Sequence, residues 1–116
     1  MVYDEATTKR FRDALAALGL QLDERRMMGG LCFMLAGNML GGAHREKTGE
    51  RLFMFRVGPE AHQWALSQPN TRPVQFGDRM PMRGLVFVEA DACDDSQLNQ
   101  WVLKALEFAE GLPRKG

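Results

Sequence analysis

The sequence has few of the residues that carry out chemistry. It contains two cysteines and two histidines among 116 residues. A structural zinc site needs about four Cys or His ligands. The sequence has four such residues, and their spacing is not that of a zinc finger: Cys32, His44, His62 and Cys93. We therefore expect no metal and no cofactor. Core packing is the simplest role for both thiols, because free cysteine is among the most buried residue types.

Long apolar segments are also missing. The longest run, residues 31–36, is far shorter than the ~20 residues that span a bilayer. The first ten residues are polar and charged, unlike a signal peptide. We expect a cytoplasmic protein with reduced thiols and no membrane contact.

Neither sign of charge is in excess, since 15 Lys and Arg balance 15 Asp and Glu. This balance excludes a uniformly basic nucleic-acid-binding protein. The net charge of zero nevertheless results from segments of opposite charge that cancel. Residues 25–83 carry nine basic and four acidic side chains, whereas residues 1–24 have a net charge of −2 and residues 84–116 of −3. The basic middle has two interpretations: contact with phosphates, or pairing with acidic surfaces of this chain or of a second copy.

The remaining composition is that of a folded domain. Hydrophobic residues make up 45% and charged residues 26% of the chain, which are ordinary globular values. The length predicts one domain over residues 1–116. Residues 112–116 follow Gly111 and include Pro113, so we expect a frayed tail there.

Apolar periodicity predicts a helix near each end of the chain, over residues 4–18 and 94–110. The expected N-caps are Asp4 or Thr8 for the first helix and Asp94 or Asp95 for the second. The predicted buried stripe of the second helix consists of Leu98, Trp101, Val102, Ala105, Leu106 and Ala109.

Between these helices the pattern changes to that of strands. Strands are predicted at residues 31–36, 39–43, 51–57 and 84–88, with a short extended piece near 73–76. Segment 51–57 is apolar on both faces and should be central in the sheet. A short helix over 59–67 begins at Pro59 and should bury Ala61, Trp64 and Ala65. The Gly37-Asn38 turn implies antiparallel pairing. The sequence therefore predicts an α+β fold: a single antiparallel sheet flanked by helices, in the order α-β-β-β-α-β-β-α.

Several stretches, in order along the chain, resemble the N-terminal domain of the TfoX/Sxy family. They are RRMMGGLCF at 25–33, GNM at 37–39, FMFRVGPEA at 53–61, PMRGLVFV at 81–88 and the closing helix with Trp101. Met28 stands where that family commonly has Phe. The resemblance covers roughly residues 5–113 and implies an antiparallel sheet with flanking helices, similar to type III secretion chaperones. The family's competence regulators add a C-terminal helical domain, so we expect this chain to be a stand-alone N-terminal domain.

Two sets of residues are candidates for partner contact. The first set would bind an anion or a partner through guanidinium groups and glycine N–H groups: Arg25, Arg26, Gly29, Gly30, Arg56 and Arg83. A sharp glycine turn that brings the backbone close to a neighbouring element is the simpler reading of Gly29-Gly30. The second set would bind a hydrophobic partner: Met28, Met54 and Trp64. Eight methionines favour this idea if several are exposed, because methionine surfaces adapt to varied partners.

The preferred function is a non-enzymatic regulatory or protein-interaction module that forms a homodimer or binds another protein. One alternative is nucleic-acid binding through a basic sheet face that includes Arg25, Arg26, Arg51, Arg56 and Arg83. Another alternative is a small-molecule binder or minor enzyme. That alternative requires a cavity that holds His44 or His62 beside an acid.

Overall fold

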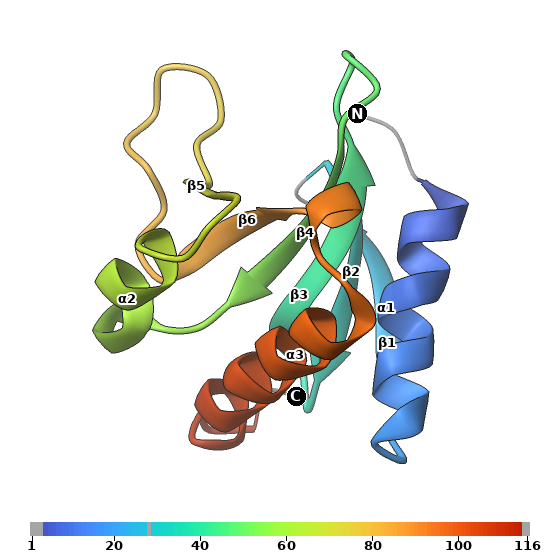
Figure 1. The fold of residues 1–116 in the computed structure, drawn as a ribbon. Coiled ribbons are helices and arrows are strands. Elements are labelled where there is room, and N and C mark those ends of the chain that lie inside the picture. Colours follow the sequence, from blue (N-terminus) through green and yellow to red (C-terminus); the bar gives the residue numbers. More distant parts are fainter. Residues whose placement is uncertain (1–3, 28, 115–116) are drawn as a thin grey trace.

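The computed structural model describes residues 4–27 and 29–114. The elements in chain order are α1 (Glu5–Ala17), β1 (Asp23–Met27), β2 (Gly30–Leu35), β3 (Asn38–Arg45), β4 (Arg51–Arg56), a 3₁₀ turn η1 (Pro59–Ala61), α2 (His62–Leu66), β5 (Thr71–Pro73), β6 (Leu85–Glu89), a 3₁₀ turn η2 (Ala90–Ala92) and α3 (Asp95–Glu110). Figure 1 shows their arrangement.

The strands form one antiparallel sheet in the order β1-β2-β3-β4-β6-β5. The predicted α+β class is confirmed, and β4 lies inside the sheet as its apolar pattern predicts. The predicted element order is wrong by one strand, because residues 23–27, where no strand is predicted, form β1. All five residues of β1 are exposed, so this strand shows no alternation of apolar and polar side chains. The short extended piece lies at Thr71–Pro73, slightly before the predicted 73–76.

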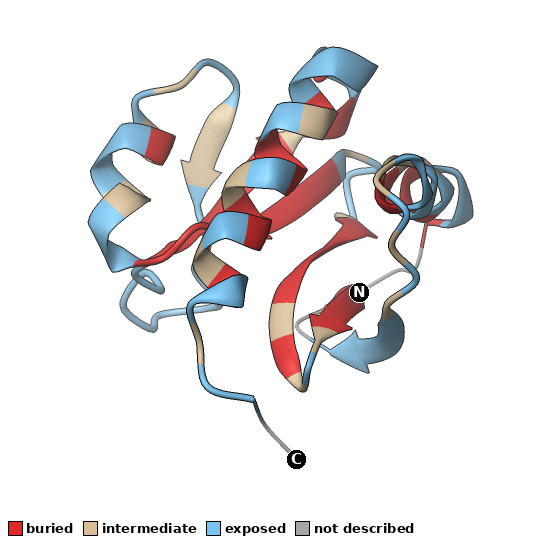
Figure 2. Ribbon diagram, turned by 90° about the horizontal axis from the view of Figure 1, so that it is seen from below, coloured by how far each residue is buried: buried red, intermediate tan, exposed pale blue. Residues whose placement is uncertain are grey.

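All three helices contribute to a core on one face of the sheet. Figure 1 shows α1 and α3 packed beside each other against the strands, and in Figure 2 buried residues alternate with exposed ones along both helices. The Phe11 ring of α1 stacks on Phe33 at 4.8 Å between centroids, and Phe55 stacks on Trp101 at 5.5 Å. The six residues predicted as the stripe of α3 are the residues that it buries.

Caps fix where the long helices begin. Asp4 accepts a hydrogen bond from the Thr7 N–H, and Asp94 forms a capping box with Gln97. Asp4 and Asp94 are therefore the N-caps, and the other two candidates are not. Each cap satisfies N–H groups that have no partner within the helix.

Gly41 and Gly42 of β3 lie too close to neighbouring elements to carry a side chain. A Cβ at Gly41 would lie 2.3 Å from the Met54 carbonyl oxygen and 3.2 Å from the Phe11 ring. A Cβ at Gly42 would lie 2.1 Å from the Leu31 carbonyl oxygen. No side chain fits at either place, so β3 passes between its neighbours without Cβ atoms at these two positions.

A second, smaller cluster lies on the opposite face of the sheet, called the second face below. Its members come from strands and from the loop that follows β5: Cys32, Met34, Leu52, Met54, Val74, Leu85 and Phe87. Leu85 and Phe87 belong to this cluster, whereas Val86 and Val88 belong to the core under the helices. Side chains along β6 therefore alternate between the two faces of the sheet. None of the described helices is long and apolar enough to cross a membrane.

Candidate interaction surfaces

The predicted glycine motif forms the turn between β1 and β2. Gly29 has a φ of +79°, and a Cβ at Gly30 would lie 2.3 Å from the Ala43 carbonyl oxygen and 2.5 Å from the His44 Cβ. These glycines therefore bring β2 close to β3, which is the simpler reading of the motif. Met28, between β1 and this turn, lies outside the described residues.

The predicted arginines do not gather on one surface. In the register of β1 and β2, Arg25 pairs with Cys32 of the second face, whereas Arg26 pairs with Leu31 of the helix-covered face. Neighbouring residues of a strand point to opposite faces. The Arg56 guanidinium carbon lies 5.4 Å from the Phe108 ring centroid of α3. Arg25, Arg26 and Arg56 therefore do not form one continuous basic face.

The other two predicted arginines differ from each other. Arg51 forms ion pairs with Asp4 at 3.7 Å and with Asp91 at 3.3 Å. Its charge is therefore already shared with two carboxylates. Arg83 is exposed in the loop before β6.

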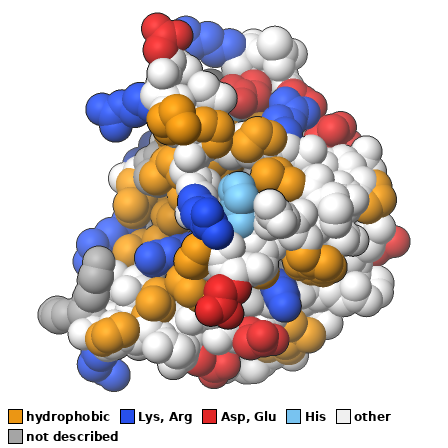
Figure 3. Space-filling view, turned by 90° about the vertical axis from the view of Figure 1, so that its left-hand side faces the viewer, with side chains coloured by type: hydrophobic (Ala, Val, Ile, Leu, Met, Phe, Trp, Pro, Cys, Tyr) orange, Lys and Arg blue, Asp and Glu red, His pale blue; other side chains and the backbone are white. Residues whose placement is uncertain are grey.

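The predicted hydrophobic contacts also separate. Met54 is only 2% exposed and lies inside the second cluster, so a partner cannot reach it in this conformation. Trp64 is 47% exposed, although the sequence predicts that its helix buries it. Met80 is 85% exposed in the loop after β5, and Met27 and Met82 are also exposed. Figure 3 shows hydrophobic and basic side chains side by side on one side of the molecule.

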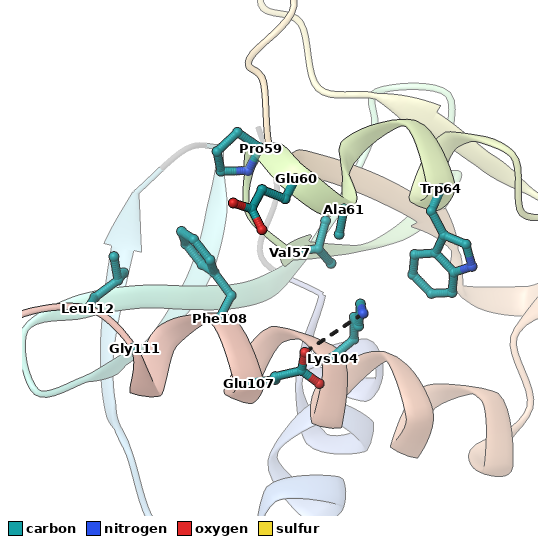
Figure 4. A pocket seen from close by; sticks show the side chains of 10 residues that line it. All are labelled: Val57, Pro59, Glu60, Ala61, Trp64, Lys104, Glu107, Phe108, Gly111 and Leu112. Carbon is teal, nitrogen blue, oxygen red and sulfur yellow. Dashed lines mark ion pairs between the residues drawn. The ribbon is translucent and has the colours of Figure 1, made fainter.

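Trp64 lines a groove between α2 and α3, called the α2–α3 groove below, with a cavity volume of about 530 Å³. Figure 4 shows Trp64 on the α2 side of this groove, facing Lys104 of α3. The Lys104 ammonium lies 5.2 Å from the Trp64 ring centroid and 3.9 Å from the Glu107 carboxylate. The floor is apolar and includes Val57 and Phe108. The groove therefore combines a flat aromatic side chain with charges at its rim.

A second groove lies on the other side of α3, beside the turn that follows α1. It has a cavity volume of about 430 Å³ and is called the leucine groove below. Its apolar lining is Leu18, Leu20, Leu35, Leu103 and Leu106, and its charged lining is Glu107 and Glu110. No sequence pattern described above predicts this groove. The available signal was Leu103, an apolar residue outside the buried stripe of α3, which is 46% exposed.

His44 lies at a cavity of about 510 Å³ near the β3–β4 turn. Its side chain is nearly buried, with the Nε2 atom 3.6 Å from Glu46 Oε1 and the ring 4.9 Å from the Phe87 ring in an edge-on arrangement. Burial lowers the pKa of His44, and the nearby Glu46 carboxylate only partly opposes that effect. The neutral imidazole is therefore favoured in the folded protein.

The remaining candidates for chemistry have structural roles. His62 Nδ1 accepts a hydrogen bond from the Gly84 N–H at 2.9 Å, which ties α2 to the start of β6. Burial raises the pKa of the Cys32 and Cys93 thiols to about 11. No group of three or more His, Cys, Asp or Glu suited to a metal ion occurs among residues 4–27 and 29–114.

These observations define an α+β domain with helices on one face of an antiparallel sheet and grooves along its last helix. The family model of the TfoX N-terminal domain matches residues 13–109. The chain belongs to this family. No curated protein and no solved structure matches it.

Proposed function

We propose that this domain is a non-enzymatic regulatory module that acts by binding a protein partner in the α2–α3 groove. Membership of the TfoX N-terminal domain family supports a regulatory role. The observation that carries the proposal is the exposure of Trp64, at 47%, on the wall of an apolar groove. We place the protein in the cytoplasm, and its partner is either a second copy of the chain or another protein.

Trp64 has the properties of an energetic centre of an interface. Tryptophan is enriched among residues whose truncation costs an interface more than about 2 kcal/mol. Its ring lies 5.4 Å from the buried Trp101 ring and under the Lys104 ammonium, so its orientation is held before a partner arrives. A side chain that is already ordered loses less conformational entropy on binding. The wall of the groove is therefore preformed.

Two observations support a function without catalysis. The thiols have a pKa near 11, and a thiolate rather than a thiol is the nucleophile in cysteine chemistry. His62 uses its Nδ1 atom to hold the Gly84 N–H. Both facts give these residues roles in packing and in joining elements.

Site-specific photo-crosslinking tests this function. A photoreactive phenylalanine analogue at position 64 should give a discrete covalent protein adduct in living cells. The same analogue at position 80, which replaces the more exposed Met80 outside the groove, should not. An adduct of twice the mass of the chain would identify a homodimer. Absence of any adduct from position 64, with the protein folded and expressed, would contradict the proposal.

Nucleic-acid binding receives less support. The predicted arginines lie on different surfaces, and Arg51 already forms ion pairs with Asp4 and Asp91. A mobility-shift titration measures it directly. Affinity that falls steeply as salt rises from about 50 to 200 mM would favour this alternative over protein binding.

Small-molecule binding has one specific observation in its favour. The cavity of about 510 Å³ brings the nearly buried His44 beside Glu46, which is the arrangement that this alternative requires. NMR spectra of imidazole protons, recorded during a screen of small ligands, would report binding at His44. A ligand that shifts the His44 signals and not those of His62 would establish this second function.

A further inference from the structure

The leucine groove is an apolar surface that the folded chain leaves open. Leu18, Leu20 and Leu35 are half-buried at its edges, and Leu103 is 46% exposed. The groove is built from three separate parts of the chain: the turn after α1, the end of β2 and the outer side of α3. Leu106 reaches from the same helix into the core, so the groove has a rigid floor. Burying such aliphatic side chains against a partner is favourable.

The charges at this groove are of one sign. Glu107 and Glu110 line it, and both belong to the last turn of α3, which has no basic residue. Negative side chains near a helix C-terminus are unfavourable, because the helix dipole is negative there. Within residues 4–27 and 29–114, Glu110 has no ion pair, and Glu107 has Lys104 at 3.9 Å. The position of these carboxylates therefore costs stability in the isolated chain and favours a cationic group from outside.

We propose that the leucine groove binds a cationic amphipathic helix of a partner protein. Aliphatic side chains spaced three and four residues apart would enter between Leu20, Leu35 and Leu103, as amphipathic helices do in apolar grooves. Lys or Arg side chains on the flank of that helix would reach Glu107 and Glu110. An anionic membrane or a nucleic acid would be repelled by the same carboxylates. The proposal rests on the proposed function as a protein-interaction module and adds the partner's chemistry and a second surface.

The experiment uses the full chain and two synthetic helical peptides of about 14 residues. Both carry Leu at i, i+3, i+4 and i+7; one has Lys and the other has Glu on the flanking positions. Binding is measured by isothermal titration calorimetry at low and moderate salt. The Lys peptide should bind, with affinity that falls as salt rises. The Glu peptide should bind at least about tenfold more weakly.

Variants locate the binding. Glu110→Lys should weaken binding of the Lys peptide about tenfold and strengthen binding of the Glu peptide. Asp78→Lys makes the same change of charge in the exposed loop after β5 and should leave both affinities unchanged. Leu103→Ala should reduce binding of the Lys peptide without unfolding the chain, because Leu103 is exposed. Circular dichroism verifies the fold of each variant.

Three outcomes would overturn the proposal: equal affinity for both peptides, no response to Glu110→Lys, or no response to Leu103→Ala. Self-association of the chain that either variant abolishes would also overturn it, since the groove would then be an interface between copies. Trp64→Ala should leave peptide binding unchanged. Failure in the leucine groove, with crosslinking from position 64 intact, would therefore leave the proposed function standing.

Discussion

The ring of Phe108 occupies the space that a side chain at Gly58 would need. A Cβ built at Gly58 lies 2.3 Å from the Phe108 Cδ1 atom, and Gly58 has a φ of +89°. Gly58 joins β4 to η1, so this contact holds α3 against the segment that leads into α2.

We expect Gly58→Ala to destabilise the protein by roughly 2–4 kcal/mol, because it adds backbone strain and a steric clash. Gly49→Ala is a matched control: Gly49 has a similar φ of +93°, but within the described part of the chain no atom is found within 4 Å of an added Cβ. It should cost about 1 kcal/mol. Urea unfolding measures both. Equal losses would mean that the Phe108 contact contributes nothing.

Asp4 should contribute stability that acid removes. Burial by itself would raise its pKa, but hydrogen bonds from Thr7 and the charges of Arg51 and Arg45 outweigh burial, so the pKa lies below its ordinary value of 3.8. The contribution is fully present above the unfolded pKa and is lost as the pH falls through the folded pKa. Asp4→Ala should cost about 1 kcal/mol at neutral pH. In unfolding curves this difference from the original protein should shrink below about pH 4.

His44 should make the fold sensitive to mild acid. Burial lowers its pKa from 6.5, so the unfolded chain binds a proton more readily than the folded one. Stability is then greatest above the unfolded pKa and declines as the pH falls from 6.5 toward the folded pKa. His44→Gln should flatten this decline. NMR titration of the imidazole measures the folded pKa, and a value above 6.5 would show that the sign is wrong.

Both cysteines should be unreactive in the folded protein. Their thiols are buried and have pKa values raised to about 11, so little thiolate is present at neutral pH. An aromatic disulfide reagent should label them only as fast as the chain unfolds. Thr48→Cys, which places a thiol on an exposed turn, should add one fast equivalent. Rapid labelling of the original chain would contradict the buried positions.

The helices were predictable because their periodic patterns and caps agree. The stripe from Leu98 to Ala109 and the cap at Asp94 together fix α3. The strand β1 was not predictable, because its residues alternate in neither burial nor polarity. β1 forms because it pairs with β2. The residues of β1 alone do not indicate this contact between strands.

The candidate site was harder to predict for a related reason. Periodicity assigns residues to faces of an element but does not say which faces remain uncovered. Trp64 lies on a helix of only five residues, and the groove beside it depends on the position of α3. Met54 is of a residue type that is common at partner contacts. It is buried here, because the loop that carries Val74 packs over the same face of the sheet.

The two edge strands of the sheet restrict how the molecule can associate. Arg25 and Arg26 are exposed on β1, and the opposite edge strand, β5, is three residues long and ends at Pro73. Four of the five side chains of β1 are charged, which discourages addition of another strand, and proline lacks the N–H that a strand ladder needs. Fibre-like growth through strand addition is therefore disfavoured at both edges. Both partner sites proposed above lie beside α3 and not at an edge strand, so occupying them leaves the ladder of the sheet unchanged.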